Sequence, residues 1–154
     1  MTRRQLMLIA ATGSLALLLG AFVFQALGYA PCKICIWQRW PHGAAIGAGV
    51  LVVLTGPLAI WGIAGALSAL GTAGIGFFHA GVELKWWEGP TSCTGGGNAL
   101  GGLSGDQLLS LDAPVNIVMC DEVTWALAGI SMAGWNAIFS IVLAGLWVVA
   151  LRRG

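Results

Sequence analysis

Three long stretches of this chain carry no charged residue, and they constrain the fold more than any other feature. They cover residues 5–32, 43–78 and 123–151. A bilayer core of about 30 Å takes about 20 helical residues to cross. The first and third stretches each have the length of one span, and the middle stretch has room for two. Only 8% of the residues are charged, against about 25% in a soluble domain, so lipid must be the surrounding solvent.

Thr55-Gly56-Pro57 divides the middle stretch, because glycine and proline interrupt helices. The predicted fold is an all-α membrane protein, in which residues 1–154 form a single domain of four transmembrane helices. The spans cover about residues 6–27, 37–55, 58–80 and 131–151. Two external loops remain, at about residues 28–36 and 81–130.

Basic residues indicate the orientation of the bundle, because Lys and Arg gather on the cytoplasmic side of a membrane. Four flank the first and last spans and three lie on the opposite side: Arg3, Arg4, Arg152 and Arg153 against Lys33, Arg39 and Lys85. Both termini are therefore predicted to be cytoplasmic. The alternative is that the first apolar run is a cleaved signal peptide, but the run is longer than a usual signal core.

Small residues recur at helical spacing in the third predicted span. Gly65, Ala69 and Ala73 form one row, and Gly62 with Ala66 forms another. Such rows let helix backbones approach closely in lipid. We therefore expect this helix to pack tightly against its neighbours.

Few polar side chains fall within the predicted spans. Asn136 is expected to hydrogen-bond between helices, and His42 is assigned to the membrane interface. A non-enzymatic membrane protein such as a transporter subunit is an alternative function. Transport should leave polar or charged groups inside the spans, so their scarcity counts against it.

The second loop contains a glycine-rich piece followed by Ser104-Gly105-Asp106-Gln107, which has the spacing of a capping box. Three leucines follow within the next four residues. Residues 104–111 are predicted to form a short amphipathic helix on the membrane surface. The alternative is an ordinary flexible loop.

All four cysteines, Cys32, Cys35, Cys93 and Cys120, fall at the predicted external loops. Disulfides persist on the oxidising side of a membrane. Three interpretations compete: structural disulfides, a four-cysteine zinc site and thiol–disulfide exchange. Closing the small ring of a C-x-x-C constrains the unfolded chain little, and Cys93 with Cys120 does not form a usual second zinc knuckle. Redox chemistry is favoured, and no metal is assigned.

Arg39 follows Cys35 by four residues, and these positions share one face of a helix. A cation beside a thiol favours the reactive thiolate. Arg39 is therefore a candidate functional residue at the outer membrane edge. The alternative is an interfacial arginine whose side chain reaches to the lipid headgroups, and the two roles are compatible.

The ordered pattern of these motifs resembles the disulfide bond formation protein B (DsbB) family. The pattern comprises the C-x-x-C with Ile36-Trp37-Gln38-Arg39, His79 at the outer end of the third span, Pro90-Thr91-Ser92-Cys93, and Cys120 ahead of Ser131-Met132-Ala133-Gly134-Trp135-Asn136. It covers nearly the whole chain, in order. C-x-x-C alone would be a weak signal, but the combination with four spans is specific.

The resemblance implies an enzyme of the bacterial inner membrane. Members of that family reoxidise a periplasmic thioredoxin-fold dithiol oxidase, DsbA, and pass two electrons to ubiquinone or menaquinone. By resemblance, Cys93 forms the mixed disulfide with this partner. Cys120 attacks Cys32 of the Cys32–Cys35 disulfide, and Cys35 leaves towards the quinone. By the same resemblance, Cys32–Cys35 and Cys93–Cys120 disulfides are expected at rest.

The quinone site, again by resemblance, contains Arg39 and His79. The case for His79 is less specific, because an interfacial histidine needs no function. A vitamin K epoxide reductase-like oxidase is a related alternative, which the Cys-Ile-Trp-Gln-Arg run disfavours. The net charge of +1 argues against nucleic acid as a partner, since phosphate binding needs a concentrated basic surface.

Overall fold

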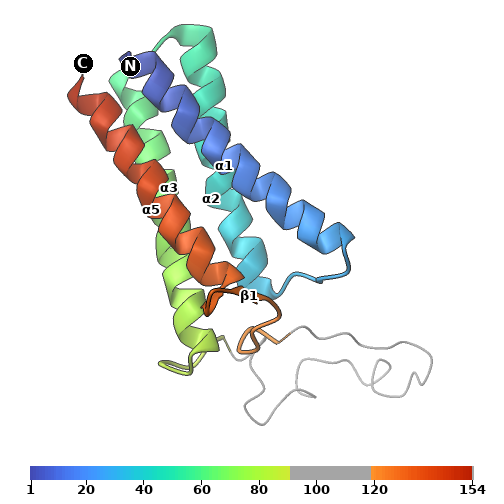
Figure 1. The fold of residues 1–154 in the computed structure, drawn as a ribbon. Coiled ribbons are helices and arrows are strands. Elements are labelled where there is room, and N and C mark those ends of the chain that lie inside the picture. The colour runs from blue at the N-terminus through green and yellow to red at the C-terminus, as the bar shows by residue number, and fades with distance from the viewer. Residues whose placement is uncertain (91–118, 154) are drawn as a thin grey trace.

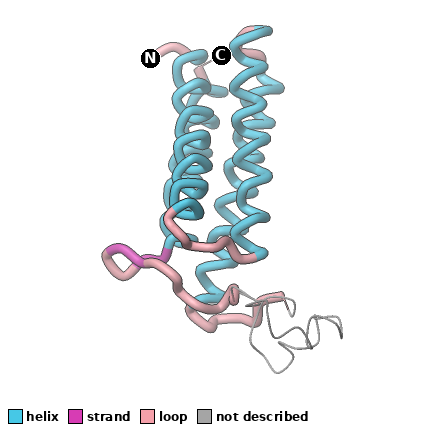
Figure 2. Tube along the Cα trace, turned by 90° about the vertical axis from the view of Figure 1, so that its right-hand side faces the viewer, coloured by secondary structure: helices cyan, strands magenta, loops and turns pink. Residues whose placement is uncertain are grey.

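A bundle of four long helices forms the part of the chain that the computed structural model describes, residues 1–90 and 119–153 (Figure 1). The helices are α1 (Arg3–Ala26), α2 (Lys33–Thr55), α3 (Ala59–Glu83) and α5 (Met132–Arg152). A short antiparallel hairpin, β1 (Ala126–Leu127) and β2 (Ile130–Ser131), precedes α5. Both termini lie at one end of the bundle, and the connections α1–α2 and α3–α5 lie at the other (Figures 1 and 2).

Three of these helices, α1, α3 and α5, are long and apolar enough to cross a membrane. Their outer surfaces carry exposed apolar side chains, among them Leu19, Leu67 and Ile141, which is the surface that lipid requires. α2 falls outside this group because its first half contains polar residues, including Gln38 and His42. Both of these side chains are buried inside the bundle, so neither would face lipid.

The helix ends agree with the predicted spans to within a few residues, except at the start of α2. That helix begins at Lys33, and the sulfur of Cys32 caps it by accepting the Cys35 backbone N–H at 3.2 Å. Cys35 therefore lies in the first turn of a helix, whereas a loop was predicted for this position. Gly56, with φ of +90°, ends the same helix at the predicted turn.

Small residues line the interfaces of α3, as their spacing predicts. Gly62, Gly65, Ala66, Ala69 and Ala73 are all buried. A Cβ added at Gly65 would lie 2.4 Å from the Trp147 ring, and one at Gly76 would lie 3.1 Å from the Ala133 carbonyl oxygen. The backbones of α3 and α5 can approach this closely only because these positions lack side chains.

Two predictions fall outside the described residues. They are the surface helix at 104–111 and the position of Cys93. The small β1–β2 hairpin, in contrast, was not predicted from the sequence.

Gly49 provides a test of the packing between α1 and α2. A Cβ at Gly49 would lie 2.3 Å from that of Ala11, so Gly49→Ala must push the two helices apart. We expect it to lower the free energy of unfolding by about 1–3 kcal/mol, the usual cost of overpacking. Gly47→Ala on the same helix is the control, because a Cβ there meets nothing within 4 Å. Thermal unfolding in detergent measures both, and equal melting temperatures would contradict the packing described.

Candidate active site

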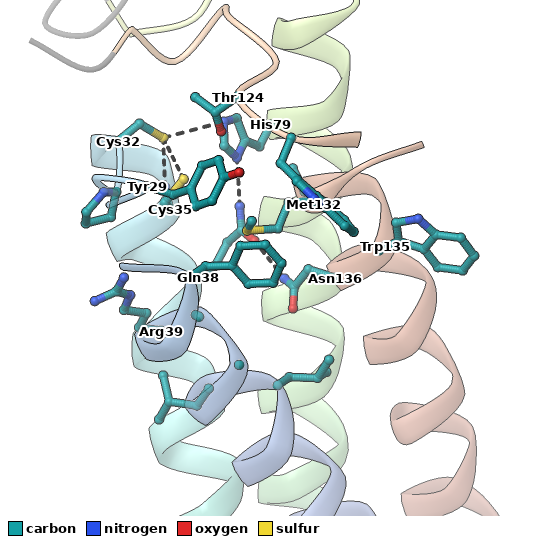
Figure 3. A pocket seen from close by; sticks show the side chains of 18 of the residues that line it. Tyr29, Cys32, Cys35, Gln38, Arg39, His79, Thr124, Met132, Trp135 and Asn136 are labelled. Carbon is teal, nitrogen blue, oxygen red and sulfur yellow. Dashed lines mark hydrogen bonds between the residues drawn. The ribbon is translucent and has the colours of Figure 1, made fainter. Parts of the chain in front are cut away.

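The two cysteines of the C-x-x-C motif face each other at the start of α2 (Figure 3). Both are free thiols, and their sulfurs are 2.9 Å apart. Cys32 is buried and Cys35 is half-buried. A disulfide was expected here at rest, and the structure instead has the reduced pair, with the sulfurs placed for a bond to form after a small rotation.

His79 of α3 approaches the same pair from across the bundle. Its Nε2 lies 3.5 Å from the Cys32 sulfur, and 3.9 Å from a carboxylate oxygen of Glu83, one turn further along α3. The pKa of the Cys32 thiol is lowered to about 4. The hydrogen bond from the Cys35 thiol lowers it most, and His79 lowers it further, against a burial that raises it. Cys32 is therefore the more acidic thiol of the pair. The cation of Arg39 was expected to favour a thiolate at Cys35, but the pKa of Cys35 is raised, first because its thiol donates to Cys32.

A metal is a second use for this cluster, since donor atoms of Cys32, Cys35 and His79 lie within 4.8 Å of one another. Two sulfurs on a tetrahedral zinc would stand about 3.8 Å apart, given Zn–S bonds of about 2.3 Å. The sulfurs here are closer, at 2.9 Å. Cys120 cannot complete a four-cysteine site because it is disulfide-bonded. The geometry favours disulfide chemistry over metal binding.

A cavity of about 370 Å³ opens beside the thiol pair. Apolar and aromatic residues of α1 and α5 form much of its wall, including Phe24, Trp135 and Phe139. Arg39 and Asn136 add polar groups. A largely apolar wall with a few polar groups is typical of sites for small organic ligands.

Arg39 lies on this cavity wall and also contacts α1. Its Nη1 donates to the Gln25 side-chain oxygen at 2.9 Å, and the guanidinium lies 4.7 Å from the centre of the Phe22 ring. Its Nε is buried and has no hydrogen-bond partner among the residues that the structure describes. The guanidinium has five N–H donors, and the described residues pair one of them, with Gln25. Donors of Arg39 therefore remain for a ligand, while the side chain also links α2 to α1.

A network of buried polar side chains continues from His79 into the bundle (Figure 3). His79 contacts Gln38, Gln38 contacts Asn136, and Asn136 contacts both His42 and Thr72. Asn136 thus joins helices, as expected. The interfacial assignment of His42 is wrong, because its side chain is 3% exposed and bonded to Asn136.

Sequence reasoning gave no role to Gln38, Thr72 or Glu83. The sequence did hold a signal for Gln38, because it lies four residues before His42 and the two must share a helix face. That face points into the bundle, where polar residues need partners. The pairing with Asn136, 98 residues away from Gln38, carries no such local signal.

Cys120 lies close to the thiol pair, although it belongs to the connection between α3 and α5. It is fully buried in a cluster with Cys32, Ile34 and Val82. Asp121, which follows Cys120 in the sequence, forms an ion pair with Lys85, just after the end of α3. The structure therefore brings three of the four predicted cysteines to one place.

Comparison with known proteins agrees with this geometry. A family model described as disulfide bond formation protein DsbB matches residues 3–150. The protein named Disulfide bond formation protein B from Acidovorax sp. (strain JS42) is 30% identical over 159 residues, covering 99% of this chain and 88% of the relative. The protein of the same name from Verminephrobacter eiseniae (strain EF01-2) is 30% identical, with 99% and 87% coverage. No solved structure gives a significant match.

The family match covers almost every residue, including the α2 thiol pair, His79 and Cys120. The relatives are matched over most of their own lengths. Three helices suited to a membrane agree with a membrane protein. The chain belongs to the DsbB family of membrane oxidoreductases, which function in disulfide bond formation.

Proposed function

We propose that this protein reoxidises a periplasmic DsbA-type dithiol oxidase and passes the two electrons to a membrane quinone, ubiquinone or menaquinone. One observation carries the proposal. A reduced cysteine pair, whose buried member Cys32 has a lowered pKa and whose other member is half-buried, opens onto a largely apolar cavity of about 370 Å³. Thiols in this setting can give up electrons to an apolar acceptor that reaches them from the lipid.

The exchange begins on the second loop. A partner thiolate attacks the sulfur of Cys93 in a Cys93–Cys120 disulfide, which forms a mixed disulfide and releases Cys120 as a thiolate. Cys120 attacks Cys32 in the oxidised pair, and Cys35 leaves as a thiolate. The second partner thiol then attacks the mixed disulfide, so that the partner is oxidised and Cys93 is released.

The electrons next leave the loop cysteines. Cys93 attacks Cys120, which restores the loop disulfide and releases Cys32. A thiol of low pKa leaves a disulfide faster, so the lowered pKa of Cys32 favours its release from Cys120. The state with Cys120 in a disulfide and Cys32 and Cys35 reduced is the one in the structure. A quinone takes two electrons and two protons as the Cys32–Cys35 disulfide re-forms.

The cavity wall contains both residues proposed for quinone binding, Arg39 and His79. Arg39 has a buried donor without a partner in the described residues. Each ring nitrogen of His79 already has a protein contact, with Cys32 and with Gln38. Arg39 is therefore the stronger candidate for a hydrogen bond to a quinone oxygen.

The proposed topology has one domain with four spans, α2 included. Both termini lie in the cytoplasm, and the four cysteines lie at the periplasmic side of the bacterial inner membrane. Two observations support this. The two termini, which carry Arg3, Arg4, Arg152 and Arg153, lie at the end of the bundle opposite the start of α2, and the Gln38 and His42 side chains of α2 are buried.

A steady-state assay tests the function and the role of Arg39. Purified protein with a reduced dithiol partner should consume one quinone for each partner disulfide formed. Arg39→Ala should raise the KM for quinone roughly tenfold or more, since a hydrogen bond to a charged group is worth about 1.5–3 kcal/mol. Arg39→Lys keeps the charge but loses the planar set of donors, and should rescue only in part.

Gln25→Leu is the matched control for this assay. It removes the α1 acceptor of Arg39 and keeps the guanidinium, so KM should stay close to that of the wild type. Equal increases in KM for Gln25→Leu and Arg39→Ala would assign Arg39 to helix packing alone. Absence of quinone reduction by the wild-type protein would refute the proposed function.

The order of exchange is tested with Cys120→Ser. The resolving thiol is then missing, so a covalent complex with the partner should accumulate through Cys93. Non-reducing electrophoresis followed by peptide mass analysis identifies the linked cysteine. A complex linked through Cys32 would mean that the electrons follow a different path.

Two engineered cysteines at opposite ends of the bundle test the orientation, in a background without the native cysteines. Glu88→Cys and Thr55→Cys both replace exposed residues. A membrane-impermeant thiol reagent should label Glu88→Cys in intact spheroplasts and Thr55→Cys only after lysis. The reverse pattern would invert the proposed topology.

A further inference from the structure

A continuous chain of hydrogen bonds connects the interior of the bundle to Cys32. His42 Nε2 lies 2.9 Å from Asn136 Oδ1, and Asn136 Nδ2 donates to Gln38 Oε1 at 2.7 Å. Gln38 Nε2 lies 3.0 Å from His79 Nδ1, and His79 Nε2 lies 3.5 Å from the Cys32 sulfur. Each of the three middle residues uses one end of its side chain to accept and the other to donate.

The hydrogen bonds can run in one of two directions, depending on which way the side-chain amides of Gln38 and Asn136 are turned. In the direction described, Gln38 donates to His79 Nδ1, so His79 carries its proton on Nε2 and points it at Cys32. If both amides were turned round, the Gln38 side-chain oxygen would face His79 Nδ1. His79 would then carry its proton on Nδ1 and donate it to that oxygen. Its Nε2 lone pair would then face the sulfur, which disfavours a thiolate.

Thr72 distinguishes the two directions. Its hydroxyl lies 3.3 Å from the Gln38 main-chain oxygen, to which it donates, and 3.3 Å from the Asn136 side-chain nitrogen, from which it accepts. If Asn136 were turned round, its oxygen would face the hydroxyl. The single proton of Thr72 would then have two acceptors to serve, and one hydrogen bond would be lost.

His42 supports the same direction. Its Nδ1 is buried and has no hydrogen-bond partner within residues 1–90 and 119–153. A proton on that nitrogen would leave a buried donor unpaired, which is costly in the interior. His42 therefore carries its proton on Nε2 and donates it to Asn136, at the start of the chain.

We propose that Gln38 is a positioning residue whose side chain holds His79 as a hydrogen-bond donor to the Cys32 thiolate, with the direction set by Asn136, His42 and Thr72. This inference rests on the proposed role of Cys32 as the thiolate released when the loop disulfide is restored. Of the groups around Cys32, Cys35 belongs to α2, and His79 and Glu83 belong to α3. Two other groups face the His79 ring. The Glu83 carboxylate lies 3.9 Å from Nε2, farther than the Cys32 sulfur at 3.5 Å, and the main chain of Cys120 also hydrogen-bonds the ring.

The test measures the thiol of Cys32 without partner or quinone. The reduced protein, with Cys93 and Cys120 replaced by Ser, is alkylated across a pH range, and peptide mass analysis reports on Cys32. Gln38→Met keeps the length of the side chain and removes the donor. It should raise the apparent pKa of Cys32 by about one pH unit, a tenfold loss of thiolate below that pKa.

A double-mutant cycle separates positioning from general loosening of the site. In a His79→Phe background, Gln38→Met should cause no further shift, because Gln38 acts through His79. Thr72→Val should shift the pKa in the same direction by a smaller amount. Ser140→Ala is the control, since this buried hydroxyl on α5 has no partner in the described part of the chain, and it should leave the pKa unchanged.

Nitrogen-15 NMR of histidine-labelled wild-type protein provides a second readout that does not depend on any Gln38 variant folding. The chain has two histidines, and both should be protonated on Nε2. A proton on Nδ1 of His79, an unchanged Cys32 pKa in folded Gln38→Met, or an additive effect in the His79→Phe background would each overturn the proposal. None of these results would change whether the protein reduces quinone, so failure of this inference is distinguishable from failure of the proposed function.

Discussion

A polar side chain in a lipid-embedded bundle must find its hydrogen-bond partners within the protein, and this requirement shapes the whole site. An unpaired group there costs several kcal/mol. Gln38 and Asn136 meet the requirement by bonding to each other and to groups on a third helix. These bonds set how α2, α3 and α5 are rotated and aligned. Because the same bonds end at His79, they also place its ring against Cys32.

The start of α2 combines a structural task with a chemical one. The sulfur of Cys32 caps the helix by accepting the Cys35 backbone N–H. The hydrogen bonds to this sulfur from Cys35 and His79 lower the pKa of Cys32 and so favour the thiolate. Helix capping and thiolate stabilisation therefore require the same geometry. A change that loosens the first turn of α2 should affect both together.

The packing of α1 leaves an open space beside the thiol pair. α1 is held to α2 near the site through Arg39, Gln25 and Phe22, and side chains of α1 form part of the cavity wall. Further from the site the two helices touch through small residues such as Ala11 and Gly49. α1 and α2 therefore pack closely at Ala11 and Gly49, and the cavity lies nearer the start of α2, beside Cys32 and Cys35.

The helices, the turn at Gly56, the small-residue faces of α3 and the place of the C-x-x-C motif next to the second helix could all be predicted from the amino-acid sequence. These features depend on local composition, namely apolar runs of span length, helix-breaking residues and spacing along one helix. Two contacts could not be predicted and are seen only in the folded bundle: His79 with Cys32, 47 residues away, and Asn136 with Gln38, 98 residues away. An apolar helix with few polar residues carries little information about its own rotation in lipid, so its partners become defined only when several helices pair their buried polar groups together.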